Sequence, residues 1–216
     1  MREFLPKSGG YRQLRVFVLA EAVYDLTAIF AERFIPYGSR TSDQMVQAAR
    51  SGRQNIAEGS QASATSKETE IKLTNVAKAS LEELLLDYED YLRQHNLPQW
   101  SSDAPRTEKL RDYLRSERFQ KAPTQFARTM PAEEYCNLCI TLINQTTYLL
   151  RRLLATQQQQ FLEQGGIKEL MYKARTTYRN QYHSNIDQQT IVGRTGRTSQ
   201  TSQTSQTDTT SNDEKK

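Results

Sequence analysis

The feature that most constrains the fold is a run of small residues in the first third of the chain. When the segment is placed on a helix at about 100° per residue, six positions fall on one narrow arc: Met45, Ala48, Ala49, Gly52, Ile56 and Gly59. Small residues let a second helix approach closely, so Ala49 and Gly52 predict a packing notch. Gly59 is placed to end the helix in a left-handed conformation. A helix with this face needs a close helical partner.

Amphipathic segments elsewhere in the chain predict such partners. The four long helices are expected at about 11–35, 41–59, 65–95 and 132–160. Thr41, Ser42 or Asp43 can cap the second of them. The third begins in the form of a capping box, in which Glu68 reaches back to the backbone amide of Thr65.

The segments between and after these helices divide the chain. Residues 1–160 are expected to form one domain, whose connection at about 97–131 is irregular apart from a shorter helix at about 106–119. A helical suffix is expected at 161–180, in which Gly165 stops the preceding helix and a short helix follows at about 167–179. Residues 181–216 contain a Ser-Gln-Thr echo and few large apolar side chains, so they predict a disordered tail.

No segment has the alternating pattern of a strand. The fold class predicted is therefore all-α: an up-down four-helix bundle with a short C-terminal helical suffix and a disordered tail.

Charge and composition restrict the function only weakly. The formal net charge is +4, with a sequence pI near 9.0, and the tail contributes equal numbers of each sign. This excess permits attraction to nucleic acid. The sequence has neither a signal-peptide core nor an apolar run of membrane-spanning length, so a soluble cytoplasmic protein is expected.

The two cysteines, Cys136 and Cys139, have the spacing of a redox or metal motif. A zinc site needs two further ligands, but no second cysteine pair exists, and His95 and His183 lie at a helix end and in the tail. Neither histidine follows a glutamate by three residues, as a di-metal bundle site requires. We therefore expect buried thiols, and neither a metal nor a cofactor.

Asn55 and Glu58 lie three residues apart, on adjoining positions of one helical side. An isolated Asn-Glu pair has no nucleophile or base partner for acid-base chemistry. We expect both residues to be structural, satisfying backbone groups at the turn after the second helix or at a subunit contact.

Basic residues form the candidate nucleic-acid surface. The candidates are Arg50, Arg53, Arg151, Arg152, Lys168, Lys173, Arg175 and Arg179. Repeated around an oligomer, they would give a multivalent phosphate-binding surface. The alternative is that they are solvated helix faces and ion pairs, because acidic residues such as Glu133, Glu163 and Glu169 are interleaved with them. The residues alone leave both interpretations open.

Several motifs carry a resemblance to a known family. They are Arg53-x-Asn55-Ile56-Ala57-Glu58-Gly59, Ser66-Lys67-Glu68 and Ala77-x-x-Ser80-x-x-Glu83. With the order of the helices, they resemble the four-helix-bundle proteins that include the 23S ribosomal RNA intervening-sequence proteins and the accessory variability proteins of diversity-generating retroelements. Leu97-Pro98-Gln99-Trp100 and the segment 161–167 resemble the branch with a suffix. The resemblance implies a small bundle that assembles into a ring, a pentamer in the retroelement members, which bind a reverse transcriptase and RNA.

The predicted function is a non-enzymatic oligomeric helical adaptor that binds RNA or DNA, or a nucleoprotein partner such as a reverse transcriptase–RNA complex, through basic surfaces. The alternative is a protein–protein interaction scaffold without nucleic-acid binding. An enzyme is the weakest hypothesis, because the sequence has no phosphate-cradling glycine loop and no nucleophile with a base at motif spacing. Salt separates the first two, since phosphate binding weakens steeply as salt rises.

Overall fold

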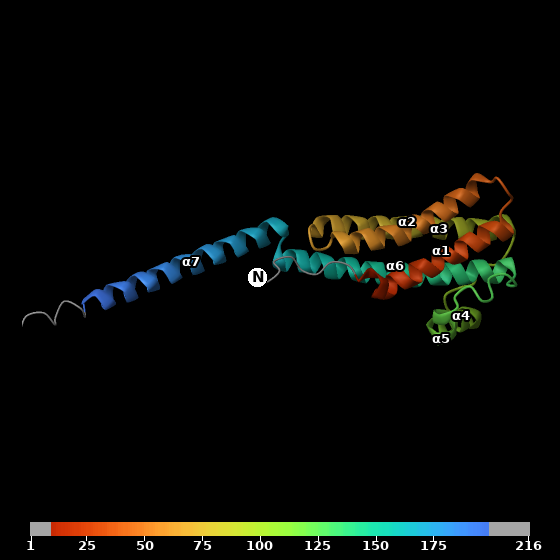
Figure 1. Ribbon diagram of the computed structural model, residues 1–216. Coiled ribbons are helices and arrows are strands. Elements are labelled where there is room, and N and C mark those ends of the chain that lie inside the picture. The colour runs from red at the N-terminus through yellow and green to blue at the C-terminus, as the bar shows by residue number, and fades with distance from the viewer. Residues whose placement is uncertain (1–9, 199–216) are drawn as a thin grey trace, which may run out of the picture. The chain divides into compact units, whose positions relative to one another are not determined.

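The computed structural model describes residues 10–198, with side chains up to His183 and at Ile186, and in this range it is helical without a strand (Figure 1). The elements in chain order are a 3-10 helix η1 (Tyr11–Gln13), α1 (Arg15–Phe34), α2 (Arg40–Ala62), α3 (Lys67–Gln94), α4 (Pro105–Arg115), α5 (Glu117–Lys121), α6 (Ala132–Gln164) and α7 (Ile167–Thr198). None of these described helices is long and apolar enough to cross a membrane.

The chain divides into two compact units, one up to Ile167 and the other from Lys168. In the first unit, α1, α2, α3 and α6 enclose one hydrophobic core. Helix α3 packs along both α2 and α6, and α1 also packs along both of them (Figure 1). Helices α4 and α5 form the connection between α3 and α6, and α4 lies against α6. The apolar face of each long helix thus finds a partner, as the helical periodicity requires.

Aromatic rings fill the centre of this core. The ring of Phe30, on α1, lies 4.9 Å from that of Tyr88, 5.0 Å from Tyr91 and 5.5 Å from Tyr135, centroid to centroid. Phe30, Tyr88 and Tyr135 are fully buried. The tilted and edge-on contacts are the arrangements that aromatic quadrupoles favour. They join α1 to both α3 and α6.

The buried tyrosine hydroxyls have partners on α1. Tyr88 Oη donates to Thr27 Oγ1 at 3.0 Å, and Thr27 Oγ1 donates to the Val23 carbonyl at 2.7 Å. Tyr135 Oη donates to the Leu26 carbonyl at 2.9 Å. A buried hydroxyl without a partner is costly, so these bonds fix where α3 and α6 sit along α1.

Two predicted helix ends differ from the structure. Helix α2 begins at Arg40, with Ser39 rather than Thr41, Ser42 or Asp43 as its N-cap. The N-cap of α3 is Ser66, whose Oγ accepts a hydrogen bond from the Thr69 amide at 3.1 Å. The predicted capping box at Thr65 was therefore placed one residue too early. Ser and Thr have similar preferences for the N-cap position, so the sequence could not separate the two.

The C-terminal part is more helical than predicted. Helix α6 continues to Gln164 and ends at Gly165, whose φ of 76° is one that glycine adopts without strain. Helix α7 does not end near Arg179 but continues to Thr198, where disorder was expected. No proline interrupts residues 167–198, and Gln, Lys and Arg are good helix formers. The rest of the predicted tail, 199–216, lies outside the described residues.

The hydrogen bond from Tyr88 to Thr27 should be measurable in a double-mutant cycle. We expect Tyr88→Phe to lower the free energy of unfolding by about 1 kcal/mol, and Thr27→Val by about 1–3 kcal/mol because it leaves a buried hydroxyl unpaired. The double variant should lose less than the sum of the two. Urea denaturation of the four proteins gives the coupling; additive losses would show that the bond contributes nothing.

Candidate nucleic-acid interface

The small-residue face of α2 lies directly against α3. A Cβ atom added at Gly52 would lie 2.6 Å from Leu81 Cδ2 and 2.7 Å from Leu81 Cγ. Leu81 is fully buried in the core, so it has little room to move away. Gly52 and the buried Ala49 are the notch that the small-residue arc predicts.

Gly59 has a different role from the predicted helix stop. It lies inside α2, which continues to Ala62, and it is buried. A Cβ atom there would be 3.4 Å from both the Glu70 carbonyl oxygen and Leu73 Cβ, which is an ordinary contact distance. Gly59 therefore lies where the end of α2 passes the beginning of α3, with room for one methyl group.

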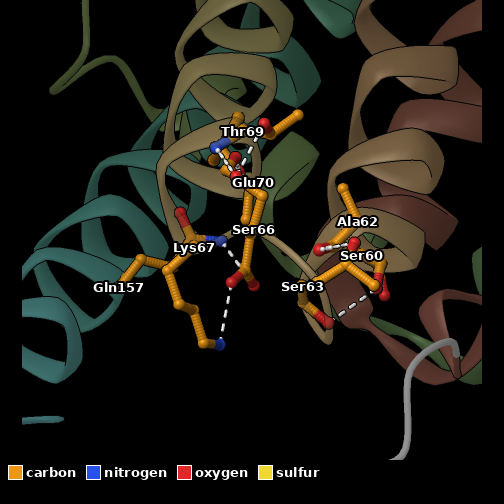
Figure 2. Close-up of polar contacts among 10 residues, drawn as sticks. Ser60, Ala62, Ser63, Ser66, Lys67, Thr69, Glu70 and Gln157 are labelled. Atoms are coloured by element: carbon orange, nitrogen blue, oxygen red, sulfur yellow. Dashed lines mark hydrogen bonds and ion pairs between the residues drawn. The ribbon is translucent and has the colours of Figure 1, made fainter. Parts of the chain in front are cut away.

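The turn between α2 and α3 is held by short polar contacts (Figure 2). Ser63 Oγ donates to the Ser60 carbonyl at 2.8 Å. The carboxylate of Glu70 accepts from Lys67 Nζ at 2.9 Å and from Gln157 Nε2 at 3.1 Å. Gln157 belongs to α6 and is buried. The Glu70 carboxylate therefore links the start of α3 to α6.

We call the segment Arg50–Gly59 the signature, and its polar members Asn55 and Glu58 make different contacts in the structure. Asn55 Nδ2 donates to the Ser51 carbonyl at 2.9 Å and to Ser51 Oγ at 3.1 Å. The Ser51 hydroxyl is in turn 2.9 Å from the Ser80 hydroxyl of α3. Asn55 therefore belongs to a polar bridge between α2 and α3.

Glu58 is exposed and its carboxylate accepts from Gln54 Nε2 at 3.2 Å, one turn earlier on the same helix. This side-chain contact differs from the backbone contact expected at the turn. A role of Glu58 in a subunit contact stays a prediction.

The two signature arginines, Arg50 and Arg53, differ in how far they are buried. Arg50 is exposed on α2. Arg53 is half-buried, and its guanidinium carbon lies 4.4 Å from the centroid of the Tyr24 ring. Burial and the neighbouring Glu21 raise the pKa of Asp25, and the charge of Arg53 opposes that rise. Arg53 thus serves contacts within the fold, and of the pair Arg50 alone has a freely exposed side chain.

Arg151 and Arg152 are exposed on α6. The Nε atom of Arg151 donates to the Thr147 carbonyl at 3.4 Å, along its own helix. Together with Arg50, these residues place isolated cations on two helices of the first unit.

Helix α7 gathers the other four candidates. At about 100° per residue, Lys168, Arg175 and Arg179 share one face, and Lys173 lies on the other side. All four are exposed. Glu169 is the only acidic residue in the segment 167–183. This helix therefore has a basic face with little compensating charge.

The aromatic residues of that face were not among the binding residues predicted from the sequence. Tyr172 and Tyr182 fall between and after its three cations, with 72% and 57% of their surfaces exposed. We call Lys168, Tyr172, Arg175, Arg179 and Tyr182 the α7 stripe. Its successive spacings of four, three, four and three residues are those of one helix face. The same spacing can be read from the sequence, but the helix was expected to end at 179, which left Tyr182 outside it.

A groove in the first unit contains three further arginines that the sequence analysis missed. It has a volume of about 660 Å³, and Arg15, Arg111, Arg115, Trp100 and Tyr148 are among the residues that line it. These residues come from α1, α4, α6 and the segment after α3. Because they lie far apart in the sequence, no local motif indicates that they meet.

Cys136 and Cys139 are both buried and unpaired thiols. Burial raises the pKa of both thiols, that of Cys139 to about 12. Within the described residues, no group of three His, Cys, Asp or Glu side chains could hold a metal ion. Neutral buried thiols pack as small apolar groups, and a redox or metal role has no support from their surroundings.

Comparison of the chain with protein-family models, with curated proteins and with solved structures finds no match.

The two signature glycines should respond oppositely to the same substitution. Gly52→Ala should lower the free energy of unfolding by about 1–3 kcal/mol, because the added methyl group overlaps the buried Leu81 side chain. Gly59→Ala meets only ordinary contacts and gains up to about 1 kcal/mol of helix propensity. Urea denaturation of both variants tests this, and equal effects at the two positions would contradict the packing described.

The cysteines should react only when the protein unfolds. At about pH 8, a thiol-specific disulfide reagent should label the native protein no faster than it unfolds, and should label the protein in denaturant at once. Rapid labelling of the native protein would contradict the burial of both thiols.

The raised thiol pKa values also predict a dependence of stability on pH. Unfolded thiols ionise above about pH 8.5, whereas the folded ones keep their protons. The folded state then binds more protons, so its stability falls as the pH rises from about 8.5 towards 12. Denaturation across this range should show a smaller fall in a Cys139→Ala variant; an unchanged fall would exclude the thiol as its cause.

Proposed function

We propose that this protein is a non-enzymatic, oligomeric helical adaptor that acts in the cytoplasm and binds single-stranded RNA, alone or within a nucleoprotein such as a reverse transcriptase–RNA complex. The observation that carries the proposal is the α7 stripe, in which exposed cations and exposed aromatic rings share one helix face. Cations attract phosphates, and aromatic rings stack with unpaired bases.

The dimensions of the stripe suit an extended ligand. From Lys168 to Tyr182 it extends over fourteen residue steps of α7, which is about 21 Å at the standard helical rise. Paired bases in a duplex have no free faces for Tyr172 and Tyr182 to stack on. The proposal therefore favours single strands over duplexes.

The first unit has a structural part in this proposal. We propose that α1, α2, α3 and α6 form an up-down four-helix bundle that assembles into a ring, as in the family that the signature resembles. A ring would place several α7 helices on one RNA and convert modest single affinities into strong binding. The exposed residues Arg50, Arg151 and Arg152 would add long-range attraction.

A protein–protein scaffold is the second candidate, and one observation favours it. Met171 and Tyr178 are 56% and 72% exposed and lie seven residues apart on α7, on a flank of the stripe. Exposed apolar side chains at heptad spacing are typical of helices that pair with another helix. If this flank is the functional surface, binding should be insensitive to salt.

RNA binding should depend on the two central arginines of the stripe. We expect fluorescence anisotropy of a labelled single-stranded oligouridine to show binding that weakens steeply between about 50 and 200 mM salt. Arg175→Gln/Arg179→Gln should weaken binding at low salt and make the slope of log K against log salt about 1.4 units shallower, at about 0.7 per phosphate contact on single strands.

The matched control is Arg40→Gln/Lys72→Gln, which removes the same net charge from exposed positions of α2 and α3. It should keep both the affinity and most of the salt slope. Equal losses of affinity in the two double variants would mean that net charge alone drives binding. If no RNA binding occurs at low salt, the protein–protein scaffold becomes the favoured function. Light scattering of the unmodified protein tests assembly, for which a monomer would be the contradicting result.

A further inference from the structure

The groove of the first unit has the size of a small-molecule site. Its walls are the beginning of α1, one face of α4, the middle of α6 and the segment 99–102. Its volume of about 660 Å³ lies within the range of about 300–1,000 Å³ that small ligands occupy. All of its walls belong to one compact unit, so the groove is part of the folded core structure.

The charge of the groove is positive and largely uncompensated. Arg15, Arg111 and Arg115 line it, and none of its lining residues is acidic. Among the side chains that the structure describes, no carboxylate lies at ion-pairing distance from Arg15 or Arg111; Arg115 contacts Asp112 at 3.5 Å, with both side chains largely exposed. Exposed pairs of this kind are weak. Three guanidinium groups are therefore available to an anion, and arginine suits phosphate in particular.

One wall of the groove is fixed by hydrogen bonds. The backbone amide of Trp100 donates to Asn137 Oδ1 at 2.8 Å, and its indole Nε1 donates to Glu133 Oε1 at 2.8 Å. Both partners belong to α6, and Asn137 is buried. Arg106, which is not a lining residue, lies over the indole ring with 5.2 Å between its guanidinium carbon and the ring centroid. Trp100 is held on its polar edge and contributes a rigid apolar surface.

On the α6 wall, by contrast, the groove has an exposed aromatic ring. Tyr148 is 56% exposed although it lines the groove. One turn earlier, Asn144 and Gln145 also line it, and each amide can both donate and accept hydrogen bonds. A stacking ring beside amide groups fits the flat, polar-edged shape of a nucleobase.

We propose that this groove binds a nucleoside monophosphate unit. Arg15, Arg111 and Arg115 take the phosphate, and Tyr148 stacks on the base. The unit can be a free nucleotide or one nucleotide of a single strand. This inference is separate from the proposed function, because the groove belongs to the first unit and does not need α7.

The single tryptophan of the chain makes the groove directly observable. Because Trp100 lines the groove, we expect AMP to change the intrinsic tryptophan fluorescence in a saturable way. Adenosine and inorganic phosphate, titrated separately, should each require at least about tenfold higher concentration, since each makes only part of the contacts. Inorganic phosphate equal to AMP would overturn the nucleotide assignment.

Variants separate the two halves of the site. Arg111→Gln should weaken AMP binding by about tenfold or more and weaken binding of inorganic phosphate as well. Tyr148→Ala should weaken AMP binding by a similar factor and leave inorganic phosphate unaffected. The control Arg40→Gln removes an exposed arginine that does not line the groove. No AMP signal, or equal losses in Arg111→Gln and Arg40→Gln, would overturn the proposal.

A final comparison identifies the source of the nucleotide. A 5′-phosphorylated oligoadenylate should produce the same Trp100 signal at lower concentration than AMP if the groove holds part of a strand. A signal from AMP alone assigns the groove to free nucleotides, and the proposal stands. This fluorescence readout is independent of RNA anisotropy, so failure at the groove and failure at α7 can be told apart.

Discussion

The close approach of α2 and α3 at Gly52 is the contact on which the rest of the first unit depends. No side chain larger than hydrogen fits between the α2 backbone and Leu81 without displacing a fully buried leucine. This contact brings α3 near enough to α2 for the Ser51–Ser80 bridge to form. The position of α3 then lets Tyr88 reach both Thr27 and the ring of Phe30. The contacts of α3 with α1 thus depend in part on the close approach at Gly52.

The signature and most of the proposed binding surfaces are therefore different parts of the molecule. Gly52, Asn55 and Arg53 all serve contacts within the fold, although polar and basic residues in one short motif resemble a site. Cations free of such contacts lie elsewhere, on α7 and in the groove lined by Arg111. A chain with a modest net charge can still bind phosphate if some of its arginines have no acidic side chain close by.

The helical class and most of the helix positions could be predicted from the sequence, because periodicity and breakers such as Gly165 act locally. The end of α2 could not, because Gly59 is a favourable helix end by local rules, and only its packing on α3 shows why the helix continues. Composition was misleading for α7, since the lack of apolar residues excludes a core but does not exclude a helix. The groove depended on tertiary structure alone, because Arg15 and Arg111 line the same groove only when α1 and α4 pack on α6.

Hydrogen–deuterium exchange with and without single-stranded RNA tests the separation of roles most directly. At low salt, RNA should slow amide exchange in the segment 167–183 of α7, because a bound strand restrains that helix. Exchange in α2 around Gly52 should stay the same, since that segment is already packed on α3. Slowed exchange at Arg50–Gly59 without any change in α7 would contradict the account, because it would mean that RNA binds at the signature.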